Sequence, residues 1–334
     1  MNLLPKAAGT RPRLACEIAP EGVTVARAAS AETPLDSVGR VPLAAGAIMP
    51  SLKPGNLADR VAVIAAIRRA MESIDIRPGR GTVRPNSRGA DLTIIVPAAA
   101  VRVLLLDFDA LPAKLTEALP IVRFRLKKLL PFEADDAMVS YQVMSSSRSV
   151  VRVLAVAMPR DVLEEYETAV REAGFDPGAV LPSTLAALAG LTGGDPSLVV
   201  NASHAGITTA ITRDGVLLLH RSVDLQPQAV GVDATLPPQL QQVSSDDLAN
   251  EIAQAVSVAV AYFEDTLSTP PSTILSAGAL TADSLRHVLS SNGYSEADAL
   301  NVRELIDASV FSAGAVTGSI PRGSLAGVAG ALRG

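Results

Sequence analysis

A basic segment that runs into a proline constrains the fold of this chain more than any other feature. The segment is Val122-Arg-Phe-Arg-Leu-Lys-Lys-Leu-Leu-Pro-Phe132, in which four cations are interleaved with apolar residues at helical spacing. Proline cannot continue a helix, so we expect the helix to end at Pro131. The acidic turn Glu133–Asp136 and a strand from Val139 to Val143 follow. This order predicts an amphipathic helix, an acidic turn and then a strand.

The composition fits a chain with a substantial core and no disulfide framework. At 334 residues, 48% of them apolar, the chain is long enough for two domains or for one domain of two lobes. The one cysteine, Cys16, excludes an internal disulfide, and three histidines without a Cys/His cluster argue against a metal site. No apolar run approaches the roughly 20 residues that cross a bilayer, and the first six residues are too short for a signal peptide. We therefore expect a protein of the reducing cytoplasm.

Charge is distributed unevenly along the chain. Residues 1–131 hold 19 Lys and Arg against 11 Asp and Glu, whereas residues 132–334 hold 10 against 23. Two interpretations stay open: solvated faces of opposite sign, or a basic lobe that faces anionic lipid or an acidic partner segment. A pI near 5.3 and 3% aromatic residues argue against nucleic-acid binding.

Periodic patterns predict alternating strands and helices along most of the chain. Residues 1–12, 29–58, 77–90 and 225–245 are rich in turn-forming or polar residues, so we expect them to be loosely structured. The expected strands are Leu14–Ala19, Gly22–Ala28, Leu92–Val96, Val101–Leu106, Ala137–Met144, Val150–Met158, Ala179–Leu181, Leu198–Val200, Gly206–Thr212, Gly215–Val223 and Ser272–Ser276. The expected helices besides the basic one are Asp59–Ile74, one capped by Asp161 that ends at Ala173, Asp246–Leu267 capped by Ser244, Ala282–Ser290, and a last helix through Arg333.

The order of helix, Pro-Phe pair, acidic turn and strand resembles the PilM family, the cytoplasmic actin-like proteins of type IV pilus assembly. It resembles more distantly the cytoplasmic GspL-type domain of type II secretion. The stretches Ala173-Gly-Phe-Asp-Pro177 and Gly327-Val-Ala-Gly-Ala-Leu-Arg333 are similar to the exit from the family's inserted subdomain and to its last helix. The resemblance implies an α/β, actin-like ATPase (ASKHA) fold of two lobes with a small inserted subdomain. It divides the chain into a disordered arm (1–12), a first lobe (13–100, resumed at 177–193 and by the C-terminal helix 315–334), an inserted strand-helix-strand-strand-helix subdomain (101–176) and a second lobe (194–314).

Actin-like ATPases hold nucleotide phosphates with two Asp-x-Gly hairpins, whose glycines let backbone N–H groups approach the phosphates. The family's first hairpin, Asp-Ile-Gly-Ser-Ser-Ser-x-Lys, corresponds here to Glu17-Ile-Ala-Pro-Glu-Gly-Val-Thr24. Ala19 replaces the glycine, Pro20 lacks an N–H, and Glu21 places a negative charge where phosphate would lie. A shift of one residue in this correspondence would instead let Gly22 serve the phosphate.

The second hairpin reads Asn201-Ala-Ser203 in place of Asp-x-Gly, so an amide replaces the carboxylate that would organise Mg²⁺. His204 follows, and a lone histidine is more often a surface residue than a catalyst. In the adenosine loop, Ser276-Ala-Gly278 keeps one of the usual two glycines. We expect a degenerate nucleotide-binding site without catalytic residues or metal ligands, formed by Glu17, Ala19, Gly22, Asn201, Ser203, Ala277 and Gly278.

These losses predict that the cleft does not hydrolyse ATP, because several phosphate contacts are missing and a carboxylate is added. No cofactor is expected, while ATP with Mg²⁺ stays open as a structural or switching ligand. The alternative is an active ATPase of the same machine. A sugar-kinase-like phosphotransferase needs a catalytic carboxylate in the cleft, and Asn201 argues against it.

The resemblance implies a scaffold on the cytoplasmic face of the inner membrane that binds the N-terminal tail of a PilN-like membrane protein. That tail carries an Asn-Leu-Leu-Pro motif and would lie in a groove between the inserted subdomain and the first lobe, with pilus motor ATPases as further partners. Residues Asn2-Leu-Leu-Pro5 of this chain have the same sequence as this motif. Three explanations stay open: a chance match, an engineered fusion, or an arm that binds in the chain's own groove. The expected partner-binding residues are Arg123, Arg125, Lys127, Lys128, Pro131 and Phe132. A second interpretation of the four cations in this set is that they only form a solvated helix face.

Overall fold

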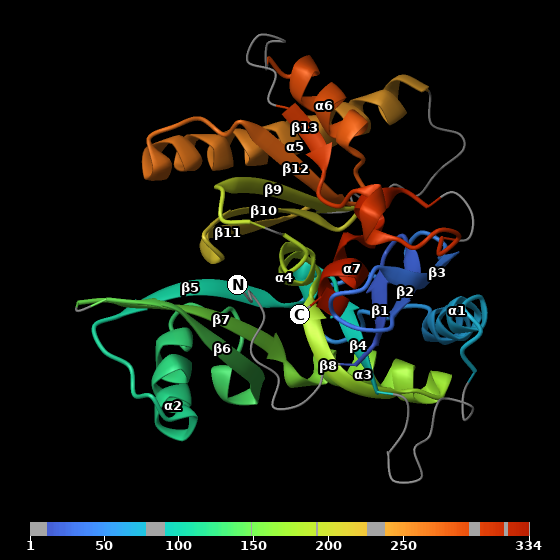
Figure 1. Cartoon of the computed structure of the whole chain (residues 1–334), viewed down its shortest axis with the longest axis horizontal. Coiled ribbons are helices and arrows are strands. Elements are labelled where there is room, and N and C mark those ends of the chain that lie inside the picture. Colours follow the sequence, from blue (N-terminus) through green and yellow to red (C-terminus); the bar gives the residue numbers. More distant parts are fainter. Residues whose placement is uncertain are drawn as a thin grey trace.

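Two five-stranded sheets stand one above the other, with a three-stranded sheet beside them (Figure 1). The computed structural model describes residues 12–77, 91–147, 149–191, 193–225, 238–293, 301–316 and 320–333, without the side chains of 91 and 238–247. The expectations for residues 1–11, 78–90 and 226–237 therefore lie outside the described residues. Within the described ranges, no helix combines the length and the apolar character needed to span a membrane.

The first sheet has the strand order β3-β2-β1-β4-β8. Its first three strands form antiparallel pairs, and β4 and β8 extend the sheet in parallel beside β1. Its strands are β1 (Leu14–Ala19), β2 (Gly22–Ala28), β3 (Leu35–Pro42), β4 (Asp91–Val96) and β8 (Asp176–Pro182). The first two strands have the bounds predicted from the sequence. The third strand was not predicted, because it lies within the segment 29–58 that we expected to be loose.

The second sheet repeats this topology, with the order β11-β10-β9-β12-β13. Again three antiparallel strands come first and two parallel strands follow beside the first of them. Its strands are β9 (Ser197–Ser203), β10 (Gly206–Arg213), β11 (Val216–Asp224), β12 (Thr273–Gly278) and β13 (Asn301–Glu304). The two sheets are thus built alike, and each begins with a tight hairpin.

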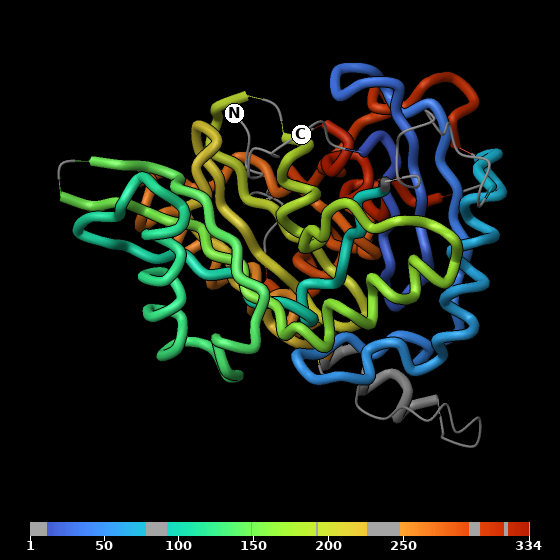
Figure 2. Tube along the Cα trace, turned by 90° about the horizontal axis from the view of Figure 1, so that it is seen from below, coloured from blue at the N-terminus to red at the C-terminus, as the bar shows by residue number. Residues whose placement is uncertain are grey.

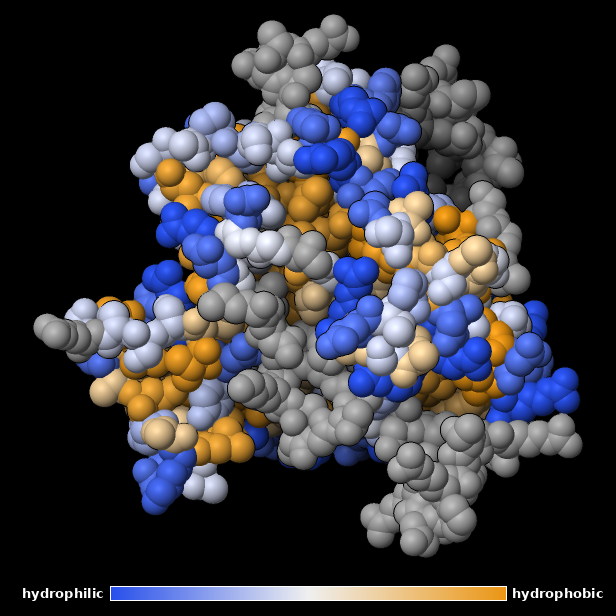
Figure 3. All heavy atoms as spheres, viewed as in Figure 1, coloured by the Kyte–Doolittle hydropathy of each residue, from blue (hydrophilic) through white to orange (hydrophobic). Residues whose placement is uncertain are grey.

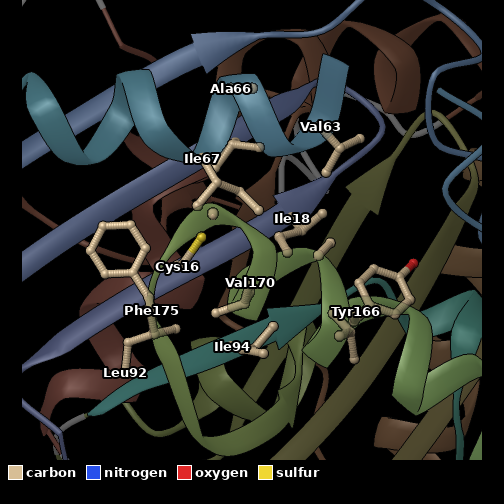
Figure 4. Packing of buried hydrophobic residues seen from close by; sticks show 14 of the residues in the cluster. Cys16, Ile18, Val63, Ala66, Ile67, Leu92, Ile94, Tyr166, Val170 and Phe175 are labelled. Atoms are coloured by element: carbon tan, nitrogen blue, oxygen red, sulfur yellow. The ribbon is translucent and has the colours of Figure 1, made fainter. Parts of the chain in front are cut away.

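Two helices, α1 (Arg60–Glu72) and α3 (Arg160–Ala173), lie side by side on one face of the first sheet (Figure 2). Asp59 caps α1 by accepting a hydrogen bond from the backbone N–H of Ala62. Side chains from both helices and the sheet form one buried cluster, in which Ile67 and Tyr166 are fully buried (Figure 4). The sequence grouped α3 with the inserted subdomain, but its buried face packs on the first sheet. Pro159 rather than Asp161 is its N-cap residue.

The second sheet is covered by α5 (Pro238–Leu267) and α6 (Ala282–Ser291). The helix α5 begins six residues before the Ser244 cap that we expected. Two further helices, α4 (Ser183–Leu188) and α7 (Ala326–Arg333), pack against each other between the sheets. Gly330 makes their close approach possible, because a Cβ there would collide with the carbonyl oxygen of Ala186. Four 3₁₀ turns complete the described elements: η1 (Ala98–Ala100), η2 (Ala134–Asp136), η3 (Ala308–Val310) and η4 (Arg322–Leu325).

The third sheet has the order β5-β7-β6 and carries one helix, α2. Its elements are β5 (Arg102–Phe108), α2 (Leu115–Leu126), β6 (Ala137–Ser146) and β7 (Val151–Pro159). Figure 2 shows this inserted sheet and α2 projecting from the body of the molecule. The helix ends at Leu126 and not at Pro131 as predicted, and Pro120 lies inside it. One face of α2 packs on the inserted sheet through Ala118, Val122 and Leu126.

Candidate functional site

A narrow cleft separates the turn of the β1–β2 hairpin from the turn of the β9–β10 hairpin. The cleft encloses about 50 Å³, and the loop after β12 closes a third side of it. Ligand pockets commonly enclose roughly 300–1,000 Å³. The structure brings together six of the seven predicted nucleotide-site residues as lining of this cleft, and the seventh, Ala277, is buried in β12 beside it. The six are Glu17, Ala19, Gly22, Asn201, Ser203 and Gly278.

Glu21 spans the cleft and joins the two hairpin turns. Its Oε1 accepts a hydrogen bond from the backbone N–H of His204, with an N–O distance of 2.6 Å. The Nδ1 atom of His204 lies 3.7 Å from the same oxygen, and the Glu21 side chain is only 11% exposed. A carboxylate that accepts a backbone N–H forms a charge-assisted bond, which is stronger than a neutral one. The chain therefore supplies its own anion between the two turns.

Glu17 belongs to β1, two residues before the strand ends at Ala19, and also lines the cleft. Its Oε2 atom is inaccessible to solvent and has no hydrogen-bond partner within the described residues. The pKa of the Glu17 carboxyl is raised to about 8, chiefly by burial and also by the charge of the nearby Glu21, while Arg40 acts in the opposite direction. Helix α7 approaches this carboxyl through Gly327, where a Cβ would lie 2.6 Å from Oε2. At neutral pH the Glu17 carboxyl is therefore protonated, and it cannot serve as a ready anionic partner for Mg²⁺.

Asn201 is held by groups of the protein itself. Its Nδ2 donates a 2.9 Å hydrogen bond to the Thr184 hydroxyl on α4. Its Oδ1 lies against Gly278, whose φ of +83° and tight surroundings exclude a side chain. An amide in this position carries no negative charge, so it cannot organise the water shell of a divalent cation as a carboxylate does.

The N-terminus of α6, which follows the loop after β12, is bound by a carboxylate of the protein itself. This loop leads into α6, and helix N-termini attract anions because their first N–H groups lack intrahelical partners. The N–H of Ala282, the first residue of α6, donates a 2.9 Å hydrogen bond to Oε1 of Glu304. Nη1 of Arg40, a residue that lines the cleft, donates a 2.6 Å bond to the Ser324 hydroxyl. Protein side chains therefore already bind the first N–H of α6 and the Arg40 guanidinium.

The predicted partner-binding residues divide into two groups. Nη1 of Arg123 donates hydrogen bonds to the carbonyl oxygens of Ala134 and Ala137, so this cation holds the turn before β6. Lys127 forms a 2.6 Å ion pair with Asp135, and Phe132 is half-buried against the inserted sheet. The remaining three residues, Arg125, Lys128 and Pro131, are exposed.

The described residues contain no group of three or more His, Cys, Asp or Glu side chains that could hold a metal ion. Sequence reasoning missed the contacts that His204, Arg40 and Glu304 make. Glu304 and Arg40 each act from a strand that the sequence did not predict, and His204 acts through its backbone, which residue type does not reveal.

The fold matches that of a solved chain from a "PilM-PilN type IV pilus biogenesis complex". The TM-score is 0.69 at 15% identity, and the match covers 96% of this chain and 98% of the other. The chain has an actin-like, PilM-type fold. Two sheets of like topology, with a cleft between the turns of their first hairpins, form the body of this fold.

Two further solved structures match less well. The cytoplasmic domain of EpsL from the type II secretion system of Vibrio cholerae gives a TM-score of 0.45 at 12% identity, over 79% of this chain and 81% of that one. The ethanolamine utilization protein EutJ from Carboxydothermus hydrogenoformans gives 0.49 at 10% identity, over 100% and 92%. No family model and no curated protein sequence matches the chain.

Proposed function

We propose that this chain is a non-hydrolysing scaffold of a type IV pilus assembly machine. It acts on the cytoplasmic face of the inner membrane, where it binds the cytoplasmic tail of a PilN-like membrane protein. The fold shared with a chain of a PilM–PilN complex supports this machine and this partner. The hydrogen bond from His204 to Glu21 is the observation that carries the non-hydrolysing part.

The electrostatics of the cleft support this reading. A bound triphosphate would bring several negative charges beside Glu21 in a space screened from water, where like charges repel strongly. It would also have to displace the Glu21 carboxylate from the N–H of His204. Pro20 offers no N–H in compensation. Phosphoryl transfer depends on positioned donors and cations around the phosphates, so a cleft that repels phosphate cannot catalyse it.

An edge strand offers a place for the tail. Strand β8 ends the order of the first sheet, on the side where the inserted sheet lies (Figure 1). Its residues are mostly exposed or half-buried. The outer edge of such a strand presents backbone N–H and C=O groups to which an extended peptide can add as a further strand. We propose that the tail binds along β8, between the first lobe and the inserted sheet.

A peptide titration tests the partner. A fluorescent peptide with the N-terminal tail sequence of a PilN-like protein should bind the full chain saturably, with a micromolar Kd that ATP does not change. A peptide of the same composition in scrambled order is the control and should not bind. Equal binding of both peptides, or none of either, would refute the proposed partner.

A phosphate-release assay tests the absence of hydrolysis separately. Purified chain with Mg²⁺ and ATP, with and without the tail peptide, should release no more phosphate than buffer alone. Release that is stimulated by the peptide would support the active ATPase instead.

A further inference from the structure

The outer face of α2 exposes large apolar side chains that nothing in the described chain covers. Ile121 and Phe124 lie one helical turn apart on this face and are 40% and 68% exposed, and Leu129, just beyond the helix, is 49% exposed. Figure 3 shows the resulting hydrophobic area at the lower left, over α2. The opposite face of α2 already contributes the core of the inserted subdomain. The exposed side chains are therefore not needed to hold the helix in place.

Cations surround this apolar face. Residues 114–128 contain five Lys and Arg against one acid, Glu117. Two of the cations form ion pairs, Lys114 with Glu117 and Lys127 with Asp135. Arg125 and Lys128 are exposed and have no ion-pair partner in the described part of the chain.

The Lys128 ammonium and the Phe124 ring form one joint surface. The Nζ atom of Lys128 lies 6.0 Å from the centroid of the ring, which is within the range of a cation–π contact. This contact places a positive charge directly beside Phe124, the most exposed aromatic side chain among the described residues.

We propose that this face of α2 docks on an anionic lipid surface. Phe124 and Ile121 enter the head-group region, while Arg125 and Lys128 bind lipid phosphates. The inference rests on the proposed function, which puts the chain beside the inner membrane, and it adds the surface by which the chain touches lipid.

Size and charge favour lipid over a protein partner. Three apolar side chains on a convex helix are too few for a stable protein interface, which buries about 800 Å² per partner. A helix with an aromatic residue between cations suits the membrane–water interface, where no matching surface is required. The whole chain carries −5 and residues 114–128 carry +4, so the remainder carries −9. This polarity turns α2 toward an anionic membrane.

Vesicle co-sedimentation of the full chain tests the proposal. Vesicles of phosphatidylcholine with phosphatidylglycerol should bind at least about tenfold more protein than phosphatidylcholine alone, and high salt should abolish the difference. The double variant Arg125→Glu/Lys128→Glu should lose this preference, and Phe124→Ser should weaken binding about tenfold.

Matched variants exclude a general effect of charge or hydrophobicity. Lys53→Glu/Arg69→Glu changes the net charge equally at exposed positions outside α2, and Val61→Ser removes an apolar side chain that is 79% exposed on α1. Both should bind vesicles like the wild type. Vesicle binding that is absent, or that the α2 variants leave unchanged, would overturn the proposal.

Two further readouts separate this proposal from its alternatives. The α2 variants should keep wild-type affinity for the PilN-like tail peptide, so the vesicle result stands whether or not that peptide binds. If Phe124→Ser instead dissolves a dimer in sedimentation velocity and vesicles do not bind, the face joins two copies of the chain and the lipid proposal is wrong.

Discussion

The Glu21 carboxylate lies 2.6 Å from the backbone nitrogen of His204, although the two residues are 183 positions apart in the chain. Each residue belongs to the turn of the first hairpin of its sheet, so one hydrogen bond joins the two turns across the cleft. In a phosphate-binding hairpin, a backbone N–H at this turn would point at the ligand. Here a protein carboxylate accepts it, so the hydrogen bond joins the two hairpin turns.

Removal of the Glu21 charge should weaken this hydrogen bond. Glu21→Gln replaces a charge-assisted bond by a neutral one, so we expect the free energy of unfolding at pH 7 to fall by about 1–2 kcal/mol. Urea denaturation measures this change. Glu32→Gln, at an exposed position in the turn between β2 and β3, is the control and should stay within about 0.5 kcal/mol of the wild type. Equal effects of the two variants would show that the cleft contact contributes nothing.

The buried Glu17 carboxyl should make stability depend on pH. Its folded pKa of about 8 lies above the ordinary value of 4.5, so the folded chain holds this proton more tightly than the unfolded chain. The contribution to stability is complete below about pH 4.5 and is lost as the pH rises to about 8. Glu17→Gln cannot ionise. The melting temperature of Glu17→Gln, relative to that of the wild type, should therefore rise as the pH increases from 5 to 8. A difference that does not change with pH would contradict the raised pKa of Glu17.

Two neighbours should shift the pKa of Glu17 in opposite directions. Glu21→Gln removes a negative charge and should lower the pKa of the Glu17 carboxyl, whereas Arg40→Gln removes a positive charge and should raise it. The carboxyl carbon chemical shift of Glu17, followed by NMR against pH, reports both changes. Shifts of the same sign would show that the three side chains do not face one another as the structure has them.

The contact between α4 and α7 should tolerate no side chain at Gly330. A Cβ there would collide with the carbonyl oxygen of Ala186, so Gly330→Ala must move one helix and should cost about 3 kcal/mol of stability. Gly46→Ala is the control. Gly46 has a φ of +82°, and a Cβ there would meet no other atom. The Gly46→Ala variant should therefore lose only about 1 kcal/mol of stability, through backbone strain. A Gly330→Ala variant as stable as this control would argue against the close helix contact.

Local sequence patterns predicted much of the fold. Strands β1 and β2 were predicted to the residue, because alternating apolar residues flank a turn with Pro20 and Gly22. The strand β3 was missed, since Gly39 and its polar neighbours read as a loop. It is a strand because its backbone pairs with β2, and Gly39 allows close contact with α1. Pattern reasoning sees the side chains of a segment but not the neighbouring strand that pairs with its backbone.

The cleft was predictable in its parts but not in its connections. The lost glycine at Ala19 and the amide at Asn201 can be read from hairpin positions, and the structure places both at one cleft. The bond from His204 to Glu21 depends on how two distant hairpins meet, which no local pattern encodes. The end of α2 was misplaced for a related reason. Leu126 packs into the core of the inserted subdomain, and the chain leaves the helix in a turn directly after it, so that Leu130 and Phe132 pack against the same core.

A titration of the unmodified chain with fluorescent ATP, with and without Mg²⁺, tests most directly the claim that Glu21 keeps phosphates out of the cleft. We predict no saturable binding up to millimolar nucleotide under either condition. Micromolar binding that requires Mg²⁺ would contradict the account.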